Sequence, residues 1–290
     1  MKNFIYTSFA LLLLGCFVPT VNASAYYTNY NNIEMTEQQY NNLVQLGFTE
    51  SEIYQMGTEE FEANKDINAT LVSESNNYYK TTTITQNGIT TSSSEVITEE
   101  QYQLEKNSNV PQSRSTYDGI ITTDYKQMRT SITQVDQYQY RYKVTLTWLN
   151  MPSKRSYDII GLGFQQALVQ MNSLVQFQQN FTVSGTSYSS VVCVPQEFDT
   201  GASAVFQLPT GSLSALSSYM YYNVRKHDDE EYTITEMDAG GDYSHATSSI
   251  SETNATKHSV NHATGIELQS SISDKYDSIP VATASFYGSW

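Results

Sequence analysis

The chain has 290 residues, of which 39% are hydrophobic and 16% charged, and its formal net charge is −15. This length suffices for one sizeable domain and a smaller one, because domains usually span about 100 to 200 residues. The negative charge disfavours unaided binding to nucleic acid, since the phosphates repel an acidic protein.

Residues 1–25 have the layout of a cleaved secretory signal. Lys2 precedes an apolar run from Phe4 to Val18, and the small residues Ala23-Ser24-Ala25 follow it. The run is shorter than the roughly 18 residues that a membrane-spanning helix needs. We therefore expect secretion, with cleavage after residue 25.

Cys16 offers a second route to the cell surface. The segment Leu13-Leu14-Gly15-Cys16 resembles the lipobox of bacterial lipoproteins, in which the cysteine takes lipid. A bulky Leu14 departs from that pattern, so soluble secretion is favoured over a lipid anchor. Cleavage after Ala25 would leave Cys193 as the remaining cysteine and exclude an intrachain disulfide. We expect Cys193 to act as a small buried hydrophobic residue, because no cation near it in sequence would lower its pKa.

Residues 33–65 are predicted to form a compact helical module. The capping-box pattern, in which a threonine and a side chain three residues later satisfy each other's backbone donors, begins at Thr36 and at Thr49. Thr58, followed by two glutamates, is expected to cap a third helix.

Charge is unevenly distributed along the chain. Residues 26–105 carry 13 acidic residues and two lysines, a net −11, whereas residues 117–155 carry three acids and six bases, a net +3. The acidic front segment could therefore lie against a mildly basic surface behind it. The alternative is that the acids only keep an exported protein soluble.

The pattern changes to strands after the helical module. Residues 78–85 and 89–97 are rich in Thr, Tyr and Ile, and Asn87-Gly88 between them is typical of a two-residue hairpin turn. Thr98 then begins a near repeat of the five residues that start at Thr36, which predicts another capped helix.

A linker is predicted at residues 107–116, where Pro111 lies among Asn, Ser and Gln. It divides the chain after the signal at 1–25 into an acidic helical module with a hairpin at 26–106 and a β-rich domain at 117–290.

The clearest strand pattern spans Tyr138–Trp148, where aromatic or aliphatic residues alternate with polar ones. We expect one face of this strand in the core and the other in solvent. Residues 163–175 could carry a helix, since apolar residues recur there at helical spacing. Many short strands between Gly, Ser and Asp turns indicate a mainly β fold, an antiparallel sandwich or jelly roll. Further strands are predicted at 157–164, 177–184, 190–194, 204–208, 220–224, 232–237 and 281–287.

The histidines are the first candidate metal ligands. His258 and His262 have the spacing of zinc-binding helices, but no glutamate lies beside His258 and the surroundings favour a strand or loop. We expect His258 and His262 to be exposed polar side chains, and the metal assignment stays open. The four histidines are His227, His245, His258 and His262.

Two acidic segments, 227–231 and 238–242, supply oxygen ligands of the kind that calcium prefers. They lack the ordered ligand spacing of a calcium loop, so solvated acidic turns are expected instead.

No motif predicts catalysis or a cofactor. No serine lies in a G-x-S-x-G turn, and the segment 160–164 lacks the third glycine of a dinucleotide-binding loop. The latter predicts a buried strand with close packing.

Four segments carry a resemblance to a known group of proteins. They are Leu46–Met56, Glu59–Phe61, Tyr78–Thr82 and the ending Tyr276–Trp290. In these segments the chain resembles uncharacterised exported proteins of Gram-positive bacteria. The resemblance implies export and adds no catalytic residue.

The function that the sequence predicts is non-catalytic binding of an extracellular or cell-surface partner, a protein or a carbohydrate. The 23 tyrosines suit such surfaces, although they suit a core equally. The alternative is a β-pore-forming or antimicrobial factor, with the acidic front as a pro-segment and residues 243–273 as membrane strands. Such strands need roughly 9 to 11 alternating residues, and Glu252 and Lys257 interrupt the pattern. Membrane contact is expected only in that alternative or with lipid on Cys16.

Overall fold

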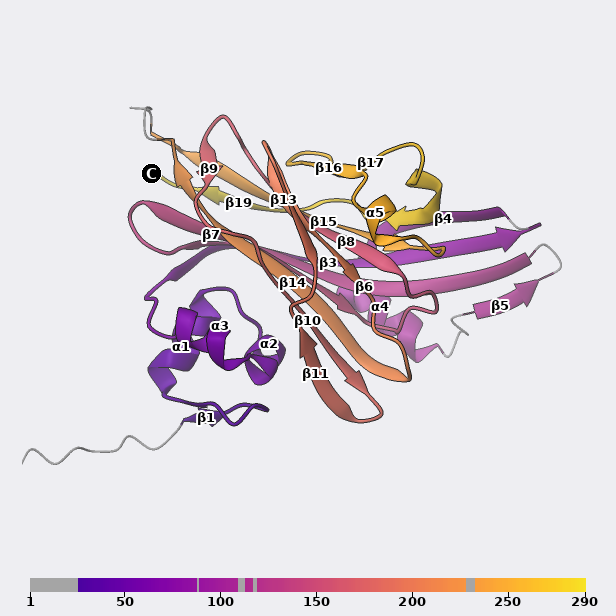
Figure 1. Cartoon of the computed structure of the whole chain (residues 1–290), viewed down its shortest axis with the longest axis horizontal. Coiled ribbons are helices and arrows are strands. Elements are labelled where there is room, and N and C mark those ends of the chain that lie inside the picture. The colour runs from indigo at the N-terminus through magenta and orange to yellow at the C-terminus, as the bar shows by residue number, and fades with distance from the viewer. Residues whose placement is uncertain (1–25, 88, 109–112, 117–118, 228–232) are drawn as a thin grey trace, which may run out of the picture.

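The computed structural model describes residues 26–290, apart from residues 88, 109–112, 117–118 and 228–232. Two antiparallel sheets pack face to face, with a helical module against the outer face of the larger one (Figure 1). The predicted mainly β, antiparallel fold is therefore confirmed. The predicted signal at 1–25, with Cys16, lies outside the described residues.

The larger sheet has nine strands in the described part of the chain. Its main path runs β11-β10-β14-β7-β6-β3-β4, with β5 beside β6 and β9 beside β14. The long strands at one end extend past the smaller sheet (Figure 1). The strands are β3 (Thr70–Gln86), β4 (Ile89–Ile97), β5 (Ser113–Thr116), β6 (Gly119–Gln134), β7 (Gln139–Trp148), β9 (Val169–Met171), β10 (Gln176–Val183), β11 (Thr186–Ser190) and β14 (Leu213–Lys226).

The smaller sheet has six strands among the described residues, in the order β12-β13-β8-β15-β18, with β19 beside the first half of β15. These are β8 (Tyr157–Phe164), β12 (Val194–Phe198), β13 (Gly201–Gln207), β15 (Glu236–Ala246), β18 (Tyr276–Ser278) and β19 (Ala282–Tyr287).

The main hydrophobic core lies between the two sheets, where Tyr142 and Tyr222 from the larger sheet meet Leu162 and Tyr243 from the smaller one. Tyr222 Oη donates to the Leu162 carbonyl at 2.6 Å, so this buried hydroxyl is satisfied within the core. The sheets approach closely at Gly241, because a Cβ there would lie 2.8 Å from a methyl of Val144.

The helical module covers the outer face of β6, β7 and β14. It contains α1 (Glu37–Gln45), α2 (Glu50–Gln55) and α3 (Thr58–Asn64), preceded by the short pair β1 (Tyr27–Thr28) and β2 (Glu34–Met35). Phe48 anchors it by edge contacts with the rings of Tyr219 and Tyr221 at 5.9 and 5.6 Å. The capping boxes at Thr36 and Thr49 are confirmed. At the third helix the N-cap is Gly57 rather than Thr58.

The predicted hairpin is confirmed as β3 and β4, with Gln86 opposite Ile89 and Asn87 in the left-handed region at φ 53°. The predicted capped helix follows as α4 (Glu99–Asn107), with a capping box at Thr98. This hairpin from the front half of the chain belongs to the same sheet as β6 and β7. Within the predicted linker, residues 113–116 form β5 and residues 109–112 lie outside the described part.

The outer face of the smaller sheet carries α5 (Glu252–Ala255), β16 (His258–Asn261), β17 (Gly265–Leu268) and the 3₁₀ turn η1 (Ser273–Lys275). The residues proposed as membrane strands therefore form a short helix and two strands of four residues each after β15 ends. No described helix combines the length and the apolar character needed to cross a membrane.

Several local expectations were wrong. Residues 191–193 connect β11 to β12, so no separate strand spans 190–194, and residues 163–175 hold the end of β8 and the short strand β9 but no helix. Of the described residues in the strand expected at 232–237, only 236 and 237 are in a strand, as the start of β15. The polar face of β7 is not in solvent, because the helical module covers Arg141, Lys143 and Thr145, which are at most 5% exposed. The buried strand with close packing at 160–164 is borne out by β8, whose glycines lie directly beneath the β16–β17 hairpin.

Candidate functional site

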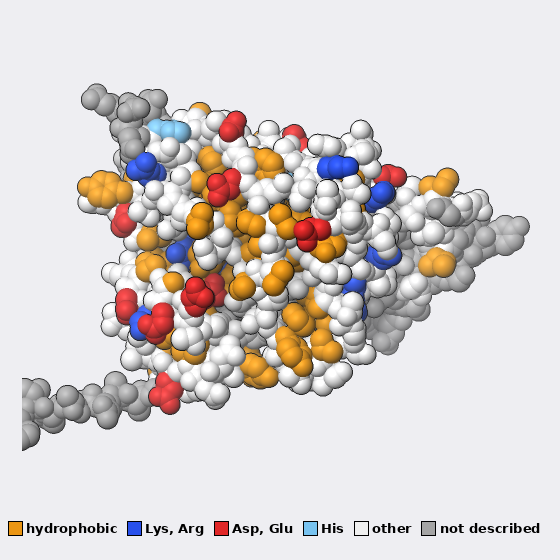
Figure 2. All heavy atoms as spheres, viewed as in Figure 1, with side chains coloured by type: hydrophobic (Ala, Val, Ile, Leu, Met, Phe, Trp, Pro, Cys, Tyr) orange, Lys and Arg blue, Asp and Glu red, His pale blue; other side chains and the backbone are white. Residues whose placement is uncertain are grey.

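A groove of about 750 Å³ lies between α3 and the edge of the larger sheet. Its walls come from residues 57–64 and from residues 189–195, and β7, β10 and β14 contribute to its floor. On the face shown in Figure 2, acidic side chains gather over the helices and hydrophobic ones over the neighbouring part of the sheet. The groove therefore has one acidic and one apolar wall.

Arg141 on β7 places a positive charge in the floor of the groove. Its guanidinium carbon lies 4.4 Å from the ring centre of Tyr221. Its Nη1 donates to Asn64 Oδ1 at 2.7 Å and its Nε to Asn223 Oδ1 at 3.1 Å. Side chains from α3, β7 and β14 thus fix the guanidinium, which retains its charge because arginine stays protonated in proteins.

Glu60 on α3 supplies an acid opposite this base. Burial raises the pKa of Glu60 to about 7, although the hydroxyl of Tyr219, which donates to Oε2 at 2.5 Å, acts in the other direction. The charge of the groove therefore changes near neutral pH.

The apolar wall is the connection between β11 and β12. Val191 and Val192 there are 69% and 79% exposed, and Tyr188 on the neighbouring β11 is 48% exposed. In the described structure β11 ends the sheet and has β10 as its one neighbour. An open strand edge beside exposed apolar side chains is the usual setting for pairing with an added strand.

The helical module is held on the sheet by a buried ion pair. Lys143 Nζ lies 2.8 Å from both carboxylate oxygens of Glu52 and 2.7 Å from Thr145 Oγ1, and the side chains of both charged residues are at most 2% exposed. Burial lowers the pKa of Lys143, and the charge of Glu52 opposes that effect. This contact confirms that part of the acidic front lies against basic residues behind it.

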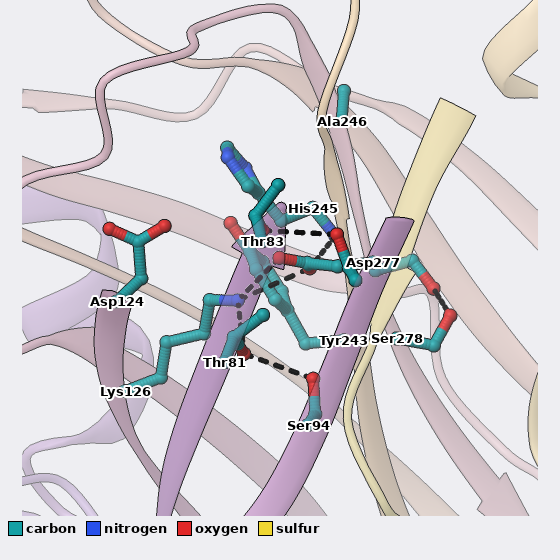
Figure 3. A network of polar contacts seen from close by, with 12 residues as sticks. Thr81, Thr83, Ser94, Asp124, Lys126, Tyr243, His245, Ala246, Asp277 and Ser278 are labelled. Carbon is teal, nitrogen blue, oxygen red and sulfur yellow. Dashed lines mark hydrogen bonds and ion pairs between the residues drawn. The ribbon is translucent and has the colours of Figure 1, made fainter. Parts of the chain in front are cut away.

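A second polar network lies between the two sheets (Figure 3). Asp158 on β8 accepts from His245 Nδ1 at 2.9 Å, from the Ala246 amide at 2.9 Å and from the hydroxyl of Tyr243. Burial alone would lower the pKa of His245, but the charge and hydrogen bond of Asp158 outweigh it and raise that pKa. Asp158 is thus fully engaged as an acceptor.

Lys126 on β6 extends this network to β18. Its Nζ lies 3.2 and 3.1 Å from the two oxygens of Asp277, and 3.3 Å from Thr81 Oγ1 (Figure 3). The amide of His245 donates to the same carboxylate at 3.3 Å. The pair joins the two sheets through side chains without access to water.

The histidines that the sequence offered as candidate metal ligands lie in different parts of the structure. His258 begins β16 and contacts Ser203 Oγ at 2.8 Å, His245 belongs to the network above, and His227 Nε2 lies 2.8 Å from the Gln166 carbonyl. His258 is buried, so the expectation of an exposed side chain was wrong there, and His262 is partly exposed. His245 is buried as well. The described residues contain no group of three or more His, Cys, Asp or Glu arranged to hold a metal ion.

The acidic segment 238–242 was expected to be a solvated turn and is instead part of β15. Asp242 is buried, and its carboxylate accepts from the amides of Tyr243 and Ile266, each at 2.6 Å. Burial raises its pKa to about 7. Residues 228–231 of the other segment lie outside the described residues.

Cys193 packs half-buried against the main core and borders the groove. Burial raises the pKa of its thiol to about 11, which keeps it protonated and unreactive near neutral pH.

Sequence reasoning missed Arg141, Lys126 and the groove itself. The signal for Arg141 was the basic net charge of residues 117–155, which indicated an acidic partner within the chain. No local signal pointed to Lys126, because Asp277 is 151 residues away in sequence.

No family model matches this chain, and no curated protein matches it. The crystal structure of the RrgA Jo.In complex is similar with a TM-score of 0.32 and 11% identity, over 61% of this chain and 83% of that one. The collagen binding domain of the Erysipelothrix rhusiopathiae surface protein RspB is similar with a TM-score of 0.26 and 4% identity, over 61% and 73%. Likenesses this slight carry no information about a ligand, so the groove is interpreted from its own residues.

Proposed function

We propose that this chain is an exported, non-catalytic protein that binds an extended segment of an extracellular or cell-surface protein. Its place among exported proteins of Gram-positive bacteria, which the sequence resemblance implies, is part of the proposal. The observation that supports this proposal most directly is the groove, whose apolar wall at Val191 continues from β11, the edge strand of the larger sheet.

The chemistry of the groove favours a protein segment over a carbohydrate. Tyr221 in the floor is 6% exposed, so its ring offers little surface on which a sugar could stack. Val191, which is 69% exposed on the groove wall, suits apolar side chains of a peptide. β11, which pairs with β10 alone in the described structure, offers backbone hydrogen bonds to an added strand. Arg141 is 5% exposed and bonded to Asn64 and Asn223, so its contribution is the positive charge of the groove floor.

The test is binding of the full chain to immobilised fibronectin, collagen and a set of polysaccharides, measured by surface plasmon resonance. We expect binding to at least one protein, and at least a tenfold loss of affinity in Val191→Glu. Val96→Glu is the matched control, because Val96 on β4 is 55% exposed and lies outside the groove.

Equal affinity of Val191→Glu and the wild-type chain would exclude the groove as the binding surface. Binding to polysaccharides alone would mean that the protein recognises carbohydrates instead of proteins. Binding to none of these probes would count against the proposal.

A further inference from the structure

The ion pair of Lys126 and Asp277 has the arrangement of two groups about to condense. The side chains are 0% and 1% exposed, and the amine lies 3.1 Å from the nearer carboxylate oxygen. We propose that Lys126 and Asp277 form an intramolecular amide, which links β6 of the larger sheet covalently to β18 of the smaller one. This crosslink is independent of the ligand proposed for the groove.

Burial supplies the reason for the reaction. Removing both an ammonium and a carboxylate from water costs free energy that their mutual attraction does not always return. An amide between the same side chains is neutral and keeps one donor and one acceptor. Condensation therefore removes two buried charges and leaves groups that the neighbouring polar side chains can satisfy.

The surroundings keep water away and hold the amine in place. Lys126 Nζ lies 4.7 Å from the centre of the Trp148 ring, and Thr81 Oγ1, its other partner, is itself 3.0 Å from Ser94 Oγ. The amide of His245 donates to Asp277 and fixes the carboxylate against the amine. Because the reacting groups are already in contact, the entropy cost of bringing them together was met during folding.

We assign to Asp124 the transfer of the proton that the reaction must move. It precedes Lys126 by two residues on β6, so both side chains lie on the same face of the strand (Figure 3). Burial raises the pKa of Asp124, while the charges of Lys126 and His245 act in the opposite direction. Asn150 Nδ2 donates to its carboxylate at 3.3 Å.

The step balances without any other reactant. A proton first passes from the ammonium to the carboxylate of Asp277 along their hydrogen bond, which gives a neutral amine and a carboxylic acid. Lys126 Nζ then attacks Cγ, and the C–N bond forms. Asp124 takes a proton from the nitrogen and returns one to the departing hydroxyl, so the C–O bond breaks and one water leaves.

The other buried pair, Lys143 with Glu52, provides an internal comparison. Its amine also donates to Thr145 Oγ1 at 2.7 Å, and that hydroxyl donates to Glu52 at 2.7 Å. Thr145 thus holds both charges at 2.7 Å and favours the ionic form, whereas the further partners of Lys126 and Asp277 lie at 3.3 Å. We therefore assign the crosslink to Lys126 and Asp277 alone.

The test is the mass of the full chain after purification and denaturation, together with a tryptic digest. We expect the protein to be lighter than its sequence by the mass of one water. The digest should yield a branched peptide that joins residues 115–129 to residues 276–290, since trypsin does not cleave after an acylated Lys126.

Three variants test which groups react and which residue carries the proton. Lys126→Arg should have its full mass, and Asp277→Asn should lose ammonia in place of water, because its side-chain amide would be the leaving group. Asp124→Asn should fold, as judged by circular dichroism, and keep its full mass, whereas Asp124→Glu should restore the water loss.

A wild-type chain with its full mass would overturn the proposal. A water loss without the branched peptide would also overturn it, because a succinimide at Asp277 has the same mass. A branched peptide that contains Lys143 and Glu52 would assign the crosslink to the other pair.

Discussion

Glu60 is the residue whose ionisation most directly links the groove to pH. Its carboxyl lies within reach of Tyr219 and Tyr221 and near the Glu52–Lys143 pair, and burial raises its pKa from 4.5 to about 7. The folded protein therefore holds a proton at Glu60 over a range in which the unfolded chain releases it. Stability falls as the pH rises between those two values.

Glu60→Gln should remove this pH dependence, because glutamine does not ionise. At pH 5 the variant and the wild-type chain should have similar free energies of unfolding, since Glu60 is protonated when folded. At pH 8 the variant should be more stable by about 2 kcal/mol, given 1.36 kcal/mol per pKa unit and partial exposure of the residue. Urea unfolding at pH 5 and pH 8 measures the free energy of unfolding of the variant and of the wild-type chain. The same difference between the two proteins at both pH values would show that the pKa of Glu60 is not raised by folding.

At the scale of elements, the packing of β15 against the larger sheet depends on the absence of a side chain at Gly241. A Cβ there would overlap Thr130 Oγ1 on β6 and lie 2.8 Å from Val144 on β7. Both neighbours belong to a central part of the sheet, so neither can move without disturbing the core.

Gly241→Ala should therefore lower the free energy of unfolding by about 2 kcal/mol, the usual cost of overpacking a core. Gly57→Ser is the matched control, because a Cβ at Gly57 meets nothing within 4 Å and serine is a favoured N-cap for α3. Thermal unfolding should show a lower midpoint for the first variant only. An unchanged midpoint for Gly241→Ala would mean that the sheets can separate locally at little cost.

At the scale of the whole molecule, the acidic front segment is part of the folded sandwich. β3 lies between β6 and β4 in the larger sheet, and the helical module covers Lys143 and Arg141. Removal of residues 26–106 would uncover one edge of β6 and leave Lys143 without its carboxylate partner.

A chain that begins at Asn107 should therefore fail to unfold cooperatively, whereas a chain that begins at Tyr26 should give a single sharp transition. Near-ultraviolet circular dichroism during heating distinguishes the two. A stable, cooperative truncated protein would support the alternative in which the front is a removable pro-segment.

Local patterns were enough to predict eight of the nineteen described strands, three capped helices and the hairpin at Asn87-Gly88, although they missed the long strand β6 and most of β15. Each depends on residues close together in sequence, where backbone geometry and alternation act directly. The acidic front and basic middle likewise indicated a contact that the Glu52–Lys143 pair makes.

Which face of a strand is buried, and which residue pairs with a buried charge, depend on the packing of elements that are distant in sequence. Alternation along β7 showed two faces, but only the helical module resting on Arg141 and Lys143 makes the polar face a buried one. Lys126 meets Asp277 because two sheets face each other, and a sequence separation of 151 residues leaves no periodic trace of that contact. Burial and charge pairing at such sites are properties of the assembled sandwich, since desolvation depends on everything that packs around a group.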